Sequence, residues 1–185
     1  MLHVIQPPAV NEAPLGKATR LDLRAAEDIA RFSLRIDPSE TAAAATAFGT
    51  PLPTRIGQLA TTPGGRLALQ LGPDEWQLLV PLSEGDAIVE SFGRLQAPHS
   101  LVDIGHREEG ILVEGEAASL ALRSAIAFDI EAMPVGTGCR TVFDKAQIIL
   151  IRETENRFRI EVWRSFADHV WHILHAASRE IALGI

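Results

Sequence analysis

Three histidines near the end of the chain have a spacing that could serve a metal ion. His169, His172 and His175 recur every third residue beside Asp168, and neighbouring imidazoles can share a zinc ion. On a helix, however, positions i, i+3 and i+6 turn too far round the axis for all three side chains to reach one ion. The spacing therefore favours a polar helix flank at a surface or interface, and no metal ligand is assigned.

A second polar group, Asp103, His106 and Arg107, follows a predicted strand. A histidine with a carboxylate can carry out acid–base catalysis. Polar residues at the end of a strand more often hold a turn through hydrogen bonds to the backbone. We therefore assign no catalytic residue here and keep the three as candidate interface residues.

Cys139, between Gly138 and Arg140, is the one cysteine of the sequence. An arginine neighbour could lower the pKa of its thiol, whereas a lone packed thiol behaves as a small apolar group. The second interpretation is favoured. A single cysteine excludes a disulfide within the chain and fits a reducing cytoplasm.

Phosphate-bearing cofactors usually need a glycine-rich loop between a strand and a helix. The pairs Gly64-Gly65 and Gly136/Gly138 lack those flanking elements. No cofactor-binding residue is therefore assigned.

Size and charge narrow the functional classes. The 185 residues suffice for one domain or two small packed halves, and 46% hydrophobic residues suffice for a core. A net charge of −7 without a Lys/Arg cluster argues against nucleic acid or an anionic membrane as the main partner. No apolar stretch approaches the roughly 18 to 20 residues needed to span a bilayer, and the N-terminus lacks a signal-peptide pattern. We expect a cytoplasmic protein.

The stretch 146–177 predicts a β-hairpin followed by a helix. Residues 146–151 form an apolar run typical of a strand buried on both faces. Apolar and polar residues alternate over 158–162, which indicates a half-buried strand. Residues 165–168 read Ser-Phe-Ala-Asp, the pattern of a capping box at a helix start.

The same pattern occurs 82 residues upstream. An apolar run at 67–71 precedes a turn at 72–75, and Trp76 then occupies the place of Phe158. Residues 83–86 repeat the capping box in register. Shared period, turn and cap predict an internal structural repeat.

Each half is expected to run strand, helix, strand, strand, helix. The first half, about 30–97, contains a strand at 32–36 and an alanine-rich helix at 39–48 that ends at Gly49. The second half, about 101–178, is expected to open with a strand at 101–104, followed by a strand at 111–113 and a helix at 116–128.

The predicted fold class is therefore α+β, with helices packed on an antiparallel sheet. We expect a single domain over residues 21–185, preceded by an extended, proline-rich arm over residues 1–20.

Trp163, Arg164 and Trp171 surround the start of the last predicted helix. Tryptophan and arginine are the typical anchors of protein interfaces, and core packing is the equal alternative for the two tryptophans. With Asp103, His106 and Arg107 these residues make up the candidate interface. A chain without an assigned active site is more consistent with a binding or structural subunit than with an enzyme.

Four stretches resemble the gamma subunit family of heterotetrameric sarcosine oxidases. They are LGPDEW at 71–76, VDIGHR at 102–107, DKA at 144–146 and EVWRSFA at 161–167, and their order and spacing agree. EVWRSFA is the most specific.

The resemblance implies a non-catalytic structural subunit that assembles with alpha, beta and delta subunits. In that family the complex demethylates sarcosine oxidatively to glycine, with tetrahydrofolate as one-carbon acceptor and oxygen as electron acceptor. The resemblance also implies that FAD, FMN, NAD and zinc belong to the other subunits, so that this chain carries no cofactor and no active site of its own.

The second half also resembles the N-terminal folate-binding region of the aminomethyltransferase family. Residues 103–106 match its Asp-Val-Ser-His, and Asp129 falls where that family has its catalytic aspartate. Phe128 replaces the adjacent asparagine, and the acidic pair of the following hairpin is missing at 144–147. We therefore do not assign Asp129 as catalytic.

Two alternatives follow from these resemblances. The first is a stand-alone folate-binding or one-carbon transfer protein, which would need Asp129 and the Asp103/His106 region to line one pocket. The second is an iron–sulfur maturation factor of the same fold, whose Lys-Gly-Cys-Tyr type motif is matched at Gly138 and Cys139 alone.

Overall fold

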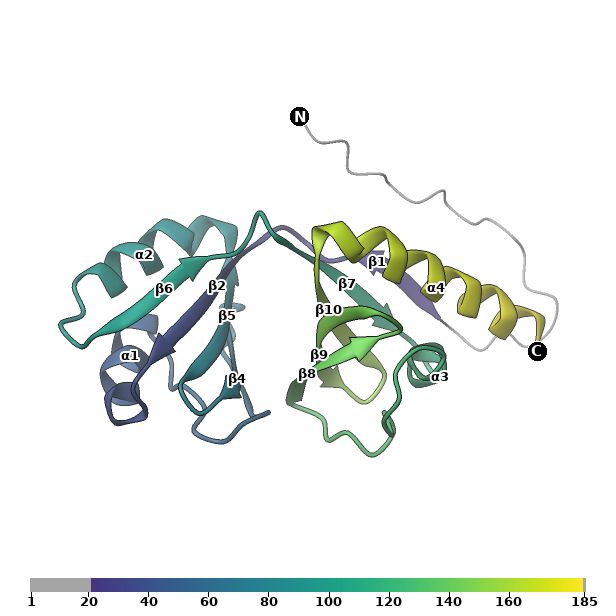
Figure 1. The fold of residues 1–185 in the computed structure, drawn as a ribbon, viewed down its shortest axis with the longest axis horizontal. Coiled ribbons are helices and arrows are strands. Elements are labelled where there is room, and N and C mark those ends of the chain that lie inside the picture. The colour runs from purple at the N-terminus through teal and green to yellow at the C-terminus, as the bar shows by residue number, and fades with distance from the viewer. Residues whose placement is uncertain (1–20, 185) are drawn as a thin grey trace.

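The computed structural model describes residues 21–184. Two five-stranded sheets face each other, and each carries two helices on its outer face (Figure 1). All paired strands are antiparallel. The predicted α+β class is thus confirmed, while the arm expected over residues 1–20 lies outside the described residues.

The first sheet has the strand order β3-β4-β5-β2-β6. Its strands are β2 (Ile29–Ile36), β3 (Leu59–Thr61), β4 (Leu67–Gly72), β5 (Glu75–Pro81) and β6 (His99–Asp103). Its helices are α1 (Thr41–Phe48) and α2 (Gly85–Gly93), each preceded by a short 3-10 turn, Pro38–Glu40 and Leu82–Glu84.

The second sheet has the strand order β1-β7-β10-β9-β8. Its strands are β1 (Asp22–Ala25), β7 (Glu108–Glu114), β8 (Thr137–Phe143), β9 (Ala146–Thr154) and β10 (Arg157–Trp163). Its helices are α3 (Ala118–Arg123) and α4 (Arg164–Leu183).

The predicted repeat is present in the structure. The hairpin β4-β5 leads into α2 as the hairpin β9-β10 leads into α4. Trp76 on β5 and Phe158 on β10 occupy equivalent places, 1% and 0% exposed, in the cores beneath the helices of their respective sheets.

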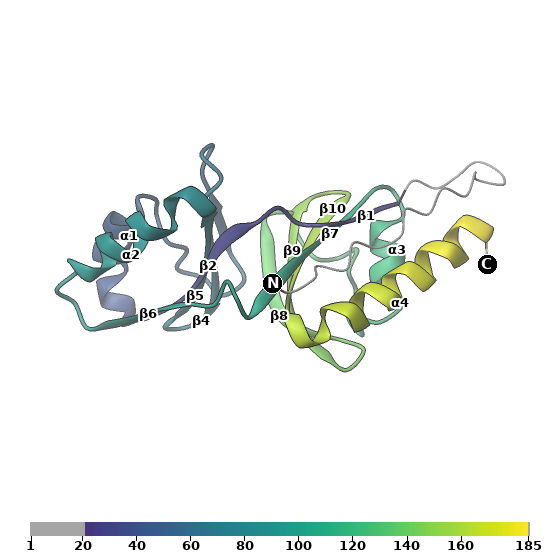
Figure 2. The same cartoon turned by 90° about the horizontal axis from the view of Figure 1, so that it is seen from above.

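The edge strands are exchanged between the halves. The strand predicted at 101–104 is β6, and it pairs with β2 of the first sheet instead of opening the second sheet. Conversely β1, which precedes β2 in the chain, pairs with β7 of the second sheet. The chain therefore crosses between the sheets twice, at residues 26–28 and 104–107. Figure 1 shows both crossings at the same end of the molecule, and Figure 2 shows them running between the two halves. We propose that the two half-units form one domain in which each contributes an edge strand to the sheet of the other.

Both predicted capping boxes are wrong. Helix α2 begins at Gly85 after a 3-10 turn that contains Ser83, and no side chain caps it. Helix α4 begins at Arg164 directly after β10, so Ser165 already lies in its first turn. The backbone N–H of Arg164 donates instead to the carbonyl oxygen of Arg107 at 2.8 Å, and this bond satisfies one free donor of the helix start.

Other boundaries also differ from expectation. Helix α3 covers residues 118–123 and not 116–128, with Leu122 turned inward and Leu120 exposed. The sequence patterns do not predict β1, β3 and β8, because these strands lie at the edges of the sheets. Edge strands are only partly buried, so their apolar residues show little regular alternation.

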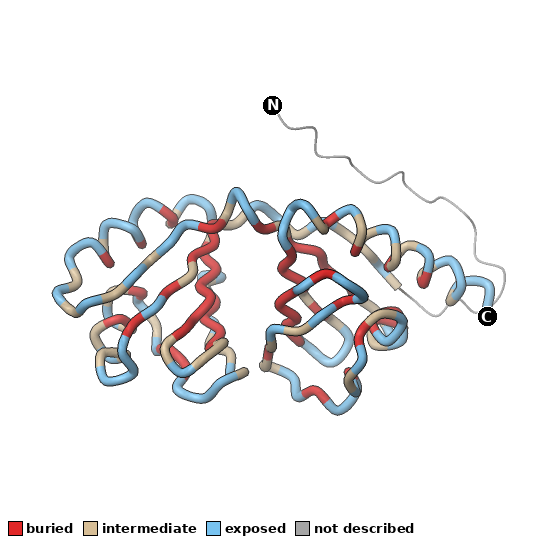
Figure 3. The backbone as a smooth tube through the Cα atoms, viewed as in Figure 1, coloured by how far each residue is buried: buried red, intermediate tan, exposed pale blue. Residues whose placement is uncertain are grey.

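Buried residues form three clusters, two beneath the helices and one between the sheets. Figure 3 shows runs of buried residues along strands of both sheets. The third cluster contains Leu67, Leu69 and Leu79 of the first sheet and Ile149 and Ile151 of the second. Central strands of both sheets are therefore covered on both faces, which holds the sheets together as one body.

At position 110 on β7, neighbouring segments come so close to the backbone that glycine is required. A Cβ atom there would lie 2.7 Å from the Cβ of Ala26 and 3.0 Å from both Arg31 Nη2 and Glu161 Oε1. A side chain would therefore collide with the crossing segment and with two charged groups between the sheets.

We expect Gly110→Ala to lower the free energy of unfolding by about 1–3 kcal/mol, the usual cost of overpacking. Gly93→Ala is the matched control, because a Cβ at this helix position meets nothing within 4 Å. It should be neutral or stabilising by up to about 1 kcal/mol. Urea denaturation of the two variants measures both values, and equal stabilities would contradict the close approach at Gly110.

Candidate functional site

Charged side chains lie between the two sheets beside the apolar cluster. Arg31 on β2 donates from Nε to Glu161 Oε2 on β10 at 2.6 Å, with side-chain exposures of 6% and 0%. Arg159 Nη1 lies 3.0 Å from the other oxygen of Glu161. The polar face of β10, expected to meet solvent, therefore meets the opposite sheet.

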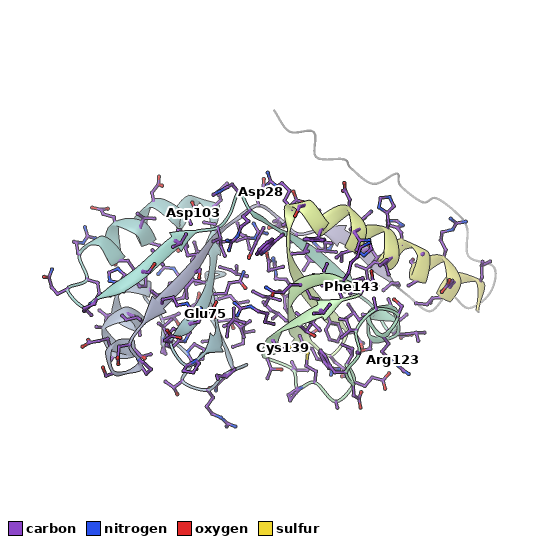
Figure 4. All side chains as sticks on the ribbon, in the orientation of Figure 1. Asp28, Glu75, Asp103, Arg123, Cys139 and Phe143 are labelled. Atoms are coloured by element: carbon purple, nitrogen blue, oxygen red, sulfur yellow. The ribbon has the colours of Figure 1, made fainter. Side chains whose placement is uncertain are left out.

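A second ion pair spans the sheets farther from the crossing. Glu75 on β5 accepts from two nitrogens of Arg140 on β8, at 2.5 and 3.1 Å. Figure 4 shows Glu75 on the inner side of its strand, in the space between the sheets. The hydrogen bond from Arg140 lowers the pKa of Glu75, so this carboxyl stays ionised.

Glu108, at the start of β7, is the buried carboxyl with the most perturbed acidity. It is 6% exposed, and Gln77 Nε2 on β5 donates to its Oε2 at 2.8 Å. Burial, together with the negative charge of Glu161, raises the pKa of Glu108 to about 7. Glu108 is thus largely protonated in slightly acidic solution, unlike an ordinary carboxyl.

A cavity of about 160 Å³ lies on the inner face of the second sheet, and we call it the inter-sheet cavity. Its polar and aromatic lining comprises Arg107, Glu108, Arg140, Gln147, Glu161 and Trp163. Glu108 and Glu161 are buried, so they form its floor, while the exposed Arg107 and Trp163 stand at its mouth.

Three of the six candidate interface residues meet where the chain crosses between the sheets. The guanidinium carbon of Arg107 lies 5.2 Å from the centre of the Trp163 ring, a cation–π contact. Arg164 follows in the chain, and its Nε lies 2.8 Å from Glu109 Oε1. Trp163 is 43% exposed, so it is not a core residue.

Asp103 and His106 lie beside a second cavity, of about 430 Å³, which Arg164 also lines. Asp103 accepts a hydrogen bond from the backbone N–H of Gly105 at 2.8 Å, as expected for a residue that holds a turn. Figure 4 places it at the end of β6, near the crossing.

Trp171 is not part of this group. It is partly buried against the core of the second sheet, with its ring 4.9 Å from that of His175. It lies two turns further along α4, roughly 12 Å from Trp163 at 1.5 Å per residue.

The histidine trio is divided among separate contacts. His169 Nε2 lies 2.7 Å from Asp144 Oδ2, whereas His172 Nδ1 faces the backbone oxygen of Asp168 at 2.6 Å. Within residues 21–184, no group of three or more His, Cys, Asp or Glu side chains is placed to hold a metal.

The remaining candidates have structural surroundings. Cys139 packs beside the core of the second sheet, and burial raises the pKa of its thiol. Asp129 is exposed, and its Oδ1 accepts from the backbone N–H groups of Glu131 and Ala132 at 3.1 and 3.2 Å. Among the described helices, none is long and apolar enough to cross a membrane.

Sequence patterns do not identify the residues at the centre of the site. Arg31, Gln77, Glu108 and Arg140 lie on four different strands and meet through pairing of the strands and stacking of the sheets. Charged residues that interrupt otherwise apolar strands are visible in the sequence, but the sequence does not show which of these charges pair with each other.

The comparisons with known proteins agree with one another. A family model described as "Sarcosine oxidase, gamma subunit family" matches residues 33–180. The sarcosine oxidase subunit gamma of Corynebacterium sp. (strain U-96) is 30% identical over 180 residues, which cover 94% of this chain and 87% of that protein. The subunit gamma of Arthrobacter sp. is 30% identical over 145 residues, 76% of this chain and 70% of that protein.

Solved structures share the fold. A chain of the heterotetrameric sarcosine oxidase from Corynebacterium sp. U-96, in complex with pyrrole 2-carboxylate, superposes with a TM-score of 0.82 at 28% identity. The match covers 91% of this chain and 89% of that chain. The glycine cleavage system aminomethyltransferase T from Bartonella henselae has a TM-score of 0.69 at 13% identity over 88% of this chain and 47% of that chain, which shows a common fold.

The raised pKa of Glu108 predicts a pH dependence of stability. The folded protein holds a proton between about pH 4.5 and 7 that the unfolded chain releases. This contribution to stability is complete below about pH 4.5 and is lost as the pH rises through about 7. The free energy of unfolding should therefore fall between pH 5 and 8, by roughly 2–3 kcal/mol from this group.

Glu108→Gln is the matched control, because a neutral amide can still accept the bond from Gln77. Urea denaturation at a series of pH values should give a shallower decline for this variant than for the natural chain. Parallel curves would show that Glu108 does not carry the effect.

Proposed function

Because this chain belongs to the sarcosine oxidase gamma subunit family, we propose that it is the non-catalytic, structural gamma subunit of a heterotetrameric sarcosine oxidase. The observation that carries the proposal is the superposition of 91% of the chain on a chain of such an enzyme, with a TM-score of 0.82. The complex would demethylate sarcosine oxidatively to glycine, with tetrahydrofolate as the one-carbon acceptor.

The proposed partners are the alpha, beta and delta subunits, and the proposed place of FAD, FMN, NAD and zinc is on those subunits. The residues that the structure describes do not fit these groups. A dinucleotide site of the common type needs the end of a parallel sheet next to a helix start, and both sheets here are antiparallel. Within residues 21–184, zinc would also find no group of three ligands.

A scaffold role suits the construction of the molecule. The sheets pack on each other and carry helices outside, so surface residues are held by a core made of this chain's own residues. Rigid surfaces lose little conformational entropy on association. We propose that the candidate interface around Arg107, Trp163 and Arg164 contacts another subunit.

A stand-alone folate-binding or one-carbon transfer protein is the second possibility, and it has less support. The aminomethyltransferase structure shares the fold at 13% identity, which does not extend to a site. Asp103 lines the larger cavity, but Asp129 is not among the residues lining it. Oδ1 of each aspartate already accepts backbone N–H bonds within a turn.

Co-expression tests the scaffold proposal. We expect the full chain to co-purify with the other three subunits as one complex that oxidises sarcosine. The chain expressed alone should be colourless and without activity, and it serves as the control. The proposal fails if the chain elutes alone while the other subunits make active enzyme without it.

Asp129→Ala separates the two functional candidates. In the assembled enzyme we expect turnover within a few-fold of the natural complex, because the aspartate only holds a turn. Loss of a catalytic acid–base group would cost on the order of a hundredfold or more. A loss of that size, with assembly intact by size-exclusion chromatography, would instead support one-carbon transfer.

A further inference from the structure

The structure divides the candidate interface into residues engaged within the chain and residues that are free. Arg164 pairs with Glu109, Asp103 holds its turn, and Trp171 packs on the core. The guanidinium of Arg107, by contrast, has no hydrogen bond or ion pair with any residue of 21–184; its described contact is the ring of Trp163.

Arg107 and Trp163 stand together at the mouth of the inter-sheet cavity. The guanidinium carbon lies over the indole ring, 5.2 Å from its centre, and the N–H donors of Arg107 have no acceptor among residues 21–184. An exposed tryptophan beside an exposed arginine is the composition that dominates binding energy at protein interfaces.

Two arginines and two glutamates line this cavity. Arg107 and Arg140 contribute two cations, and Arg140 already shares its charge with Glu75. Glu161 on the floor is compensated by Arg31 and Arg159.

Glu108, the second floor carboxyl, is accompanied by Gln77 of the opposite sheet. Gln77 is 2% exposed, and its buried Oε1 has no hydrogen-bond partner among the described residues. A protonated Glu108 can donate to an amide oxygen, so this pair can be satisfied without a negative charge. Of the four charged side chains in the lining, Arg107 is therefore the one without a hydrogen-bond or ion-pair partner in residues 21–184.

We propose that the mouth of the inter-sheet cavity, with Arg107 over the ring of Trp163, docks a carboxylate side chain of a partner subunit. This inference rests on the proposed function, since it names the chemistry of the partner surface. A carboxylate can accept two parallel N–H bonds from the free guanidinium, a geometry that arginine offers and lysine does not. The indole beside it excludes water from the contact and so strengthens it.

The experiment measures the dissociation constant of the full chain for the other three subunits, purified together, by interferometry at 50 and 300 mM NaCl. Arg107→Gln should weaken binding about 10- to 30-fold at low salt, as hot-spot arginines do. It should also reduce the salt dependence, because a charged contact is lost. Arg107→Lys should recover part of the affinity.

Arg94→Gln is the matched control, since Arg94 is an exposed arginine paired with Glu90 at the end of α2, remote from the cavity. It should bind like the natural chain. Thermal melting of each variant verifies folding, and Trp163→Phe, which keeps an aromatic ring under Arg107, should bind better than Trp163→Ala.

Several outcomes would overturn the inference. Equal binding by Arg107→Gln and Arg94→Gln is one of them. Weaker binding by Arg107→Gln with an unchanged salt dependence is another, because it would indicate a contact without a carboxylate. Saturable binding of sodium acetate to the natural chain alone, lost in Arg107→Gln while assembly is unaffected, would assign the cavity to a free carboxylate. Failure of the natural chain to bind the other subunits would instead count against the proposed function.

Discussion

A buried ion pair fixes how the two sheets of this molecule sit against each other. Arg31 and Glu161 come from different sheets and meet at 2.6 Å almost out of contact with solvent. The apolar side chains that also lie between the sheets, such as Leu69 and Ile151, would tolerate small sliding because apolar attraction has no direction. A charge-assisted hydrogen bond does have direction, and removal of one partner leaves an uncompensated buried charge at a cost of about 3–5 kcal/mol. The floor of the inter-sheet cavity contains Glu161, so the shape of the candidate site depends on this pair.

The exchange of edge strands has a related effect on cooperativity. Neither sheet is complete without a strand that enters from the other side, β1 in one case and β6 in the other. Loosening one half would uncover an unpaired strand edge in the other, which proteins normally avoid. The two halves are therefore expected to unfold together, and the surface at the crossing is held by both of them.

The sequence predicts the helix-facing half of this architecture and misses the half between the sheets. Apolar residues alternate with polar ones around Phe158, and this period of two identifies the face of β10 that packs under α4. The opposite face of β10 carries arginine and glutamate, and a polar period cannot distinguish solvent from a second polar sheet. The contact of Arg107 with Trp163 joins residues 56 positions apart, as their numbers show, through strand pairing that local patterns do not encode. The individual tryptophan and arginines were identifiable from residue type, but their division into engaged and free groups required the fold.

The crossing segments also bear on how such a chain could have arisen. Each repeat runs from an edge strand through a helix and a hairpin to a final helix, and its edge strand lies in the neighbouring sheet. A polypeptide consisting of one repeat could not complete its own sheet; it would have to lend its first strand to an identical copy and accept one in return. Such a molecule is a domain-swapped homodimer with twofold symmetry. Joining the two copies into one chain by tandem duplication would convert an association that depends on protein concentration into a permanent one. The two copies could then diverge, so that a recess such as the one beside Arg107 need exist on one side alone.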